Sequence, residues 1–175
     1  MQLNVLSQLR QSIGTVATLS LDEPIVRLDE VTLRCLTGSL TLLRTDRGLL
    51  ASFEGTSYVR ERCARCLAET DCEVDIRFIE EFVPVTDATT GARISIAHDE
   101  DTYRIGPAFV LDLRDALREY LLIAEPLKPL CRPDCAGLCP TCGANLNERA
   151  CSCGLGADER WGALAGFEKN ASKGI

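Results

Sequence analysis

Residues 49–78 read LLASFEGTSYVRERCARCLAETDCEVDIRF. Apolar or small residues occupy every second position in both halves of this stretch. They are Leu49, Ala51, Phe53, Gly55, Ser57 and Val59 in the first half and Cys72, Val74, Ile76 and Phe78 in the second. A period of two residues is typical of a strand with one buried face, so the stretch predicts two antiparallel strands. The pair Cys63 and Cys66 then lies at or near the tip of a hairpin.

The segments on either side extend this sheet. Residues 32–43 are rich in β-branched residues and leucine, and residues 44–48, RTDRG, form a short polar link that ends in glycine. Such a link is typical of a hairpin turn. Residues 86–106 have no sustained period and contain an acidic run, so we expect a solvated excursion of low order there.

A helical period replaces the strand period between residues 112 and 125. The apolar positions of this period are Leu113, Ala116, Leu117, Tyr120, Leu121 and Ala124. Asp112 is the expected N-cap and Pro126 the expected end. These elements predict an α+β fold, with an antiparallel β-rich domain over residues 1–127 and the amphipathic helix 112–125 packed on its sheet.

Composition limits the class of protein. The chain has 175 residues, of which 46% are hydrophobic, and a net charge of −7. These values indicate one compact domain with a small appendage. The sequence contains no apolar run long enough to cross a bilayer and no recognisable export signal, so we expect a cytoplasmic protein with no membrane contact.

The appendage is rich in cysteine. Six of the ten cysteines fall between residues 131 and 153: Cys131, Cys135, Cys139, Cys142, Cys151 and Cys153. Clustered thiols in a reducing compartment indicate metal binding before redox chemistry or disulfides. The sequence CPTCG at 139–143 is typical of a zinc-binding turn, in which the final glycine relieves crowding next to the sulfur ligands. We therefore expect residues 128–170 to form a module held by a structural Zn²⁺, followed by a frayed tail at 171–175; a short terminal helix is expected within the module, from about 158 to 167.

The spacing leaves the ligand set open. The second pair of ligands is either Cys131 with Cys135 or Cys151 with Cys153, so six cysteines are available for the one ion that we expect. An iron–sulfur cluster is a weaker alternative. A second half-site for metal, or a pair that braces the loop, is favoured for Cys63 and Cys66, because a redox pair of this spacing normally begins a helix.

Other cysteines and the histidine have simpler interpretations. Cys35 and Cys72 lie in strand patterns and are expected to be small core residues. His98 is the only histidine and stands beside three acidic residues, so we expect it to be solvated. The sequence contains no catalytic triad and no glycine-rich phosphate loop, which predicts a protein that is not an enzyme and has no small-molecule substrate.

Nucleic-acid binding depends on local charge. The net negative charge and the low aromatic content disfavour it, but a group of arginines lies near the hairpin tip. They are Arg44, Arg47, Arg60, Arg62 and Arg65. This group could contact the backbone of RNA; alternatively, it is a solvated hairpin end whose charge is neutralised by neighbouring acids.

Several motifs together resemble one family. They are LRTDRGLLASFEG at 43–55, RERCARCLAETDCEVDIRFIEEF at 60–82, DLRDALREYLL at 112–122, PLCRPDCAGLCPTCGANLNERACSC at 129–153 and DERWGAL at 158–164. In these motifs the chain resembles the YceD-like family, also called the large ribosomal RNA subunit accumulation family. Within the family pattern, Cys63 and Cys66 match a C-x-R-C-L element, and the six clustered cysteines match its carboxy-terminal cysteines.

The resemblance implies a function in ribosome biogenesis. It predicts a small, cytosolic, bacterial protein needed for the accumulation of large-subunit (23S) ribosomal RNA. Such a protein would act as an adaptor for that RNA or for an assembly-associated protein. The alternative hypothesis is a thiol-based redox or metal-sensing protein that uses Cys63 and Cys66.

Overall fold

The computed structural model describes residues 1–94, 102–154 and 160. The chain divides into two compact units. The larger unit consists of residues 1–63 and 68–131, and the smaller one of residues 64–67 and 132–175. The smaller unit therefore combines the turn at the hairpin tip with the cysteine-rich carboxy-terminal segment.

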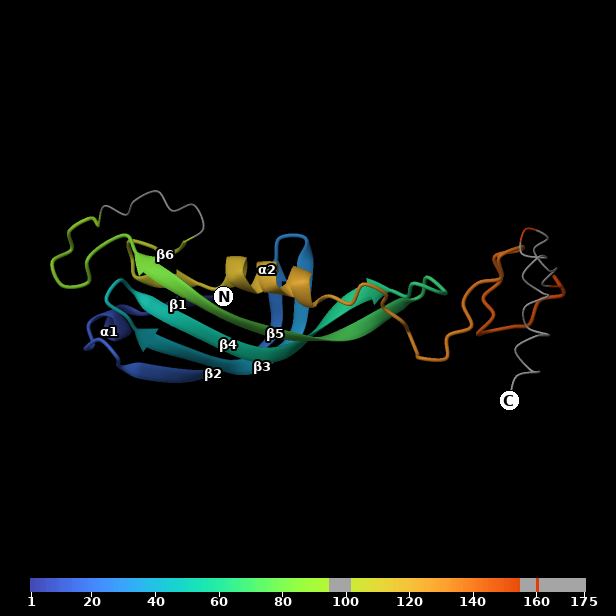
Figure 1. Cartoon of the computed structure of the whole chain (residues 1–175), viewed down its shortest axis with the longest axis horizontal. Coiled ribbons are helices and arrows are strands. Elements are labelled where there is room, and N and C mark those ends of the chain that lie inside the picture. Colours follow the sequence, from blue (N-terminus) through green and yellow to red (C-terminus); the bar gives the residue numbers. More distant parts are fainter. Residues whose placement is uncertain (95–101, 155–159, 161–175) are drawn as a thin grey trace, which may run out of the picture. The chain divides into compact units, whose positions relative to one another are not determined.

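The larger unit is built on a five-stranded sheet with the order β2-β3-β4-β5-β6 (Figure 1). Its strands are β2 (Val16–Leu28), β3 (Val31–Arg44), β4 (Leu49–Arg62), β5 (Glu69–Pro84) and β6 (Tyr103–Ile105). The first four strands pair antiparallel, and β6 runs parallel to β5. A two-stranded sheet pairs β1 (Gln2–Asn4) with β7 (Val110–Asp112), and the helices are α1 (Leu6–Leu9) and α2 (Arg114–Ala124). The expected strand-rich, antiparallel architecture is confirmed.

The two hairpins lie where the sequence predicts them. Strand β3 ends at Arg44 and β4 begins at Leu49, so residues 45–48 form the first turn. Arg62 pairs with Glu69 at the end of the second hairpin, which leaves residues 63–68 as its turn. The alternating residues of β4 and β5 are buried on one face, as Phe53 and Ile76 illustrate.

Helix α2 covers the buried face of the sheet (Figure 1). Ala116, Leu117 and Leu121 are buried in the core that the helix shares with the strands. The helix ends before Pro126, as expected, because a proline cannot continue the backbone hydrogen bonding. The expected N-cap is wrong by one position: Leu113 precedes the first helical residue, and Asp112 belongs to β7.

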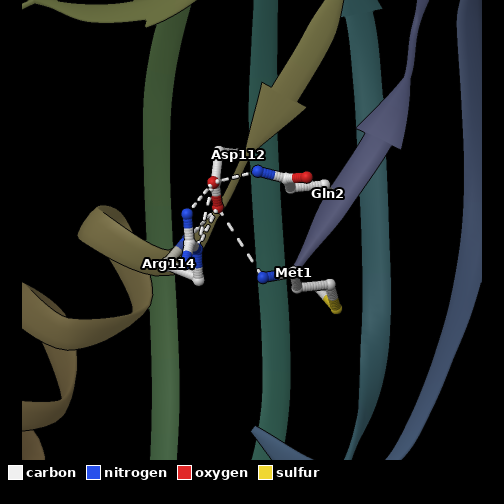
Figure 2. Close-up of polar contacts among 4 residues, drawn as sticks. All are labelled: Met1, Gln2, Asp112 and Arg114. Carbon is white, nitrogen blue, oxygen red and sulfur yellow. Dashed lines mark hydrogen bonds and ion pairs between the residues drawn. The ribbon is translucent and has the colours of Figure 1, made fainter. Parts of the chain in front are cut away.

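Asp112 instead joins three parts of the chain (Figure 2). Its carboxylate accepts hydrogen bonds from the backbone N–H of Arg114, from the Arg114 guanidinium and from Nε2 of Gln2. The amino group of Met1 lies 3.6 Å from Oδ1. Burial raises the pKa of Asp112, but these donors and the positive charge outweigh burial, so the pKa lies well below its ordinary value. The ionised carboxylate therefore fastens β1 and the start of α2 to β7.

Two other expectations are corrected. Residues 86–106 are not without structure in their described part, because Thr86 bridges Arg93 and residues 103–105 form β6. Cys35 is exposed rather than in the core. Its φ is +51°, and it lies at an irregularity in the pairing of β3 with β4 that turns its side chain out of the strand alternation. Cys72, by contrast, is half-buried beside the core.

Three sequence-based statements fall outside the described residues. They concern His98, the helix expected over residues 158–167 and the tail at 171–175. Among the described helices, none has the length and apolar character needed to cross a membrane.

Candidate metal centre

Cys63 and Cys66 lie in the turn between β4 and β5. The backbone N–H of Cys63 donates a hydrogen bond to the carbonyl of Ala68 over 2.8 Å. Leu67, which follows the second cysteine, has a φ of +62°. Cys63 is fully buried and Cys66 is 7% exposed, whereas Leu67 is 61% exposed. The turn therefore directs both thiols inward and holds its leucine in the left-handed region.

Cys139 and Cys142 lie in a turn of the same form. The backbone N–H of Cys139 donates to the carbonyl of Ala144 over 2.8 Å, again five residues along the chain. Gly143, directly after the second cysteine, has a φ of +70°. This is the conformation that favours glycine, and it agrees with the sequence-based interpretation of CPTCG as a metal-binding turn.

The structure gathers eight cysteines into two groups of four. The first cysteine group comprises Cys63, Cys66, Cys131 and Cys135, and the second comprises Cys139, Cys142, Cys151 and Cys153. Within each group the sulfur atoms all lie within 4.8 Å of one another. Around a tetrahedral Zn²⁺ with Zn–S bonds of about 2.3 Å, neighbouring sulfurs are about 3.8 Å apart. Each group could therefore hold a metal ion with only small movements of its side chains.

This division goes beyond the ligand sets considered from sequence. Cys151 and Cys153 join Cys139 and Cys142, which is one of the two alternatives. Cys131 and Cys135 join the hairpin pair instead. This grouping is compatible with the interpretation of Cys63 and Cys66 as a half-site for metal, but the sequence did not indicate that Cys131 and Cys135 complete that half-site.

Asn147 and Arg65 both contact Cys135 of the first cysteine group. Asn147 donates from Nδ2 to the sulfur of Cys135 over 3.4 Å, and its Oδ1 accepts from the backbone N–H of Ala136 over 2.8 Å. Arg65 donates from Nη1 to the carbonyl of Cys135 over 2.9 Å. Sequence reasoning singled out neither contact, because neither residue type at these positions carries a ligand signal.

Gly137 allows the chain after Cys135 to approach the hairpin turn closely. The backbone N–H of Leu138 donates to the carbonyl of Arg65 over 3.2 Å. Gly137 has a φ of +77°, and a Cβ atom there would lie 3.2 Å from that same carbonyl oxygen. Both the backbone conformation and the space at this position suit glycine.

Backbone donors favour the thiolate form in the second group. Hydrogen bonds from the backbone N–H groups of Cys142 and Thr141 lower the pKa of Cys139 below its ordinary value. The pKa of Cys151 is raised, because its thiol hydrogen-bonds to the sulfur of Cys139. A thiol whose anion is stabilised by N–H donors is well suited to metal binding, since the thiolate is the form that coordinates.

The donor chemistry identifies what these groups can do. A set of four cysteine sulfurs suits Zn²⁺ and fills its tetrahedral coordination, which leaves no position for water or a substrate. A reactive redox pair needs an accessible thiolate with a depressed pKa, commonly at a helix N-terminus. Cys63 and Cys66 are buried and lie between strands, so the geometry favours a structural role for them.

The match to a known protein family covers the same part of the chain as the two cysteine groups. Residues 52–168 match the family model described as "Large ribosomal RNA subunit accumulation protein YceD". The chain belongs to this family. The matched segment contains most of β4, all of β5 and α2, and all eight cysteines of the two groups.

Individual relatives are uncharacterized mycobacterial proteins. The chain is 32% identical over 105 residues to Mb2951c of Mycobacterium bovis and to Rv2926c of Mycobacterium tuberculosis, covering 58% of this chain and 47% of each relative. It is 30% identical over 84 residues to ML1660 of Mycobacterium leprae, covering 48% of this chain and 36% of the relative. The chain thus spans about half or less of the length of these curated relatives. No solved structure matches it significantly.

Most of the five hairpin arginines have protein partners. Arg44 donates to the carbonyls of Leu9, Thr45 and Gly48. Arg47 pairs with Glu81, and Arg60 pairs with Asp71 and Glu69. Arg65 is bound to Cys135 as described. Within the part of the chain that the structure describes, Arg62 is exposed and has no ion pair or side-chain hydrogen bond.

Proposed function

We propose that this member of the family is a non-enzymatic ribosome-biogenesis factor. It promotes the accumulation of large-subunit ribosomal RNA in the cytoplasm, and it acts as an adaptor rather than a catalyst. The observation that carries the proposal is the family match over residues 52–168, which includes the hairpin, α2 and both cysteine groups. This match connects the chain to the level of a ribosomal RNA.

A structural Zn²⁺ in the second cysteine group is part of this proposal. The four sulfurs lie within 4.8 Å of one another, and the turn at Cys139 has the backbone form of a zinc-binding turn. The described residues 132–154 contribute only Cys135 and Cys139 to the buried apolar residues. A segment with so little apolar burial needs another source of folding free energy, which metal binding supplies.

The charge distribution favours a protein as the direct partner. The chain has a net charge of −7, and acids or carbonyls occupy four of the five hairpin arginines. Binding to the RNA backbone depends on arginine and lysine side chains that can neutralise phosphates. Arg62 remains available for such a contact, but one exposed arginine gives little affinity by itself.

Affinity purification from cells tests this proposal. The tagged full chain is purified with and without nuclease, and the bound RNA and proteins are identified. An assembly-associated protein retained after nuclease treatment supports the proposal; recovery of neither an assembly-associated protein nor ribosomal RNA contradicts it. In cells depleted of the protein, the ratio of large-subunit to small-subunit ribosomal RNA should fall.

The same cells test the hairpin surface. The variant Arg62→Glu reverses the charge of the exposed hairpin arginine, and Arg27→Glu is the matched control on the exposed side of β2. If RNA binds through the hairpin, only Arg62→Glu lowers the ribosomal RNA ratio. An equal ratio for both variants assigns recognition to another surface of the protein.

A further inference from the structure

The two cysteine groups are not equivalent in their surroundings. We propose that the first cysteine group holds a zinc ion of its own and that Asn147 links this site to the second group. The inference goes beyond the proposed function, which needs only the ion of the second group. It rests on the turn geometry, the burial of Cys63, Cys66 and Cys135, and one side-chain hydrogen bond.

The two Cys-x-x-Cys turns have the same backbone form. In each, the N–H of the first cysteine donates over 2.8 Å to the carbonyl five residues later. In each, the residue after the second cysteine has a positive φ, +62° at Leu67 and +70° at Gly143. A leucine in this region is disfavoured by about 1 kcal/mol or more. The turn at Cys63 therefore adopts the metal-binding form even though its sequence lacks the glycine.

The first cysteine group combines residues from distant parts of the chain, and three of them are buried. Cys66 and Cys131 are far apart in the sequence, yet their sulfurs lie within 4.8 Å of each other and of the other two. Cys63, Cys66 and Cys135 are all less than 10% exposed. Cys131 is the exposed member of the group. Four sulfurs at this separation can fill the tetrahedral coordination of one Zn²⁺.

Hydrogen bonds orient Cys135 in the first cysteine group. Ligands of a bound metal are commonly oriented by a second layer of hydrogen bonds, and the loss of one such bond reduces affinity by about 10- to 100-fold. Asn147 provides this layer, because its Nδ2 donates to the sulfur of Cys135. Its Oδ1 accepts from Ala136 and from the guanidinium of Arg132, which fixes the orientation of the amide.

Positively charged side chains near the first cysteine group complement the negative charge that a zinc–thiolate complex would carry. Four thiolates on Zn²⁺ leave a net charge of −2 on the complex, which needs nearby donors or positive side chains. Arg65 and Arg132 both donate hydrogen bonds to residues that contact or belong to the group. We therefore assign Arg65 to the support of this site, in place of the RNA contact considered from its sequence position.

The position of Asn147 couples the two sites. It lies in the chain between Cys142 and Cys151, which are both members of the second group. An ion in the second group closes this loop and so restricts the residue that orients Cys135. Loading of the second site should therefore increase the affinity of the first site, and the coupling must be reciprocal.

Metal content tests the number of sites. The full chain is purified in the presence of zinc, freed of unbound metal and analysed by elemental mass spectrometry. We expect about two zinc ions per chain, and about one in the double variant Cys63→Ser with Cys66→Ser. The control Cys35→Ser alters an exposed cysteine outside both groups and should keep both ions. One ion in the folded wild-type chain, or two in the double variant, would overturn the proposal.

Cobalt replacement tests the same point without a ligand variant. Co²⁺ in a tetrahedral set of four thiolates gives characteristic visible absorption, so titration of the metal-free wild-type chain should show two equivalents with that spectrum. Saturation at one equivalent contradicts a separate first site.

The role of Asn147 needs a readout that folding alone would not change. Asn147→Asp keeps the oxygen acceptor for Ala136 but removes the N–H donor to Cys135. In competition with a chromophoric chelator, the Asn147→Asp variant should release one of its two ions at a chelator concentration about 10- to 100-fold lower than the wild type needs. Arg149→Ala, exposed and two residues away, is the control and should release both ions as the wild type does.

The outcomes separate this proposal from the proposed function. If Asn147→Asp releases its ions to the chelator as the wild type does, or if both sites lose affinity equally, Asn147 does not support the first cysteine group as proposed. These measurements use the isolated chain, whereas the ribosomal RNA ratio is measured in depleted cells. Either proposal can therefore fail while the other stands.

Discussion

Arg114 donates from Nη2 to Oδ2 of Asp112 over 2.6 Å, across the junction of β7 and α2. The same carboxylate holds Gln2 of β1, so one ionised group connects three elements (Figure 2). We therefore expect the stability of the larger unit to depend on the charge of Asp112, which lies outside its apolar core.

Replacement of this carboxylate should reduce stability in a pH-dependent manner. Asp112→Asn should lower the free energy of unfolding at pH 7 by about 1 kcal/mol, after allowance for screening by solvent. The pKa of Asp112 is lowered in the folded chain, so its contribution is complete above the unfolded value of about 3.9 and is lost as pH falls below it. The difference between variant and wild type should thus be constant from pH 7 to about 5 and shrink below about pH 4.

Urea unfolding followed by far-UV circular dichroism measures this difference. Asp75→Asn is the control, because Asp75 is exposed on β5 and has no ion pair within the described residues. A difference for Asp112→Asn that persists undiminished to pH 3 would contradict the assigned role of the charge.

The apolar face of α2 makes a larger contribution. Leu117 is fully buried, whereas Ile123 on the same helix is 78% exposed. Leu117→Ala should reduce the free energy of unfolding by about 2–5 kcal/mol, and Ile123→Ala should change it by no more than about 0.5 kcal/mol. The unfolding midpoint in urea distinguishes the two; similar losses would mean that α2 does not pack on the sheet through Leu117.

The hairpin turn at Leu67 stores strain that glycine would remove. Leu67 has a φ of +62° and is 61% exposed, so its replacement loses little burial. Leu67→Gly should stabilise the zinc-loaded chain by about 1 kcal/mol, because glycine enters the left-handed region without a steric penalty. The melting temperature measures the gain. Leu127→Gly, at a fully exposed leucine for which no positive φ is found, should give no increase.

The sequence contains the local signals of this fold but not their pairing. Alternation around Phe53 and Ile76 predicts buried strand faces, because a strand repeats every two residues whatever surrounds it. The glycine of CPTCG likewise indicates a turn with a positive φ, because glycine favours that conformation. The equivalent turn at Cys63 cannot be recognised in the sequence, because its residue with a positive φ is Leu67, and leucine does not indicate that conformation. The association of Cys131 with Cys63 depends on the tertiary path of the intervening chain, which no spacing rule describes.

The same limit applies to polar residues. Arg65 reads as part of a basic patch when only its neighbours in sequence are considered. Its partner, the carbonyl of Cys135, is 70 residues away in the chain. Asn147 and Asp112 are similar cases, because their roles arise from partners that the fold brings to them.

The close approach at Gly137 separates two effects of a methyl group. Gly137→Ala introduces both a strained positive φ and a Cβ atom 3.2 Å from the carbonyl of Arg65. Gly91→Ala introduces the same kind of strain at φ +71° with no atom within 4 Å. Each variant should lose about 1 kcal/mol from strain, but only Gly137→Ala should also weaken the hydrogen bond from Leu138 to Arg65 and displace Cys135 from the first cysteine group. Chelator competition on the zinc-loaded chain should therefore show easier release of one ion in Gly137→Ala and unchanged release in Gly91→Ala. Equal release in both variants would mean that metal retention does not depend on this contact between the hairpin turn and the segment after Cys135.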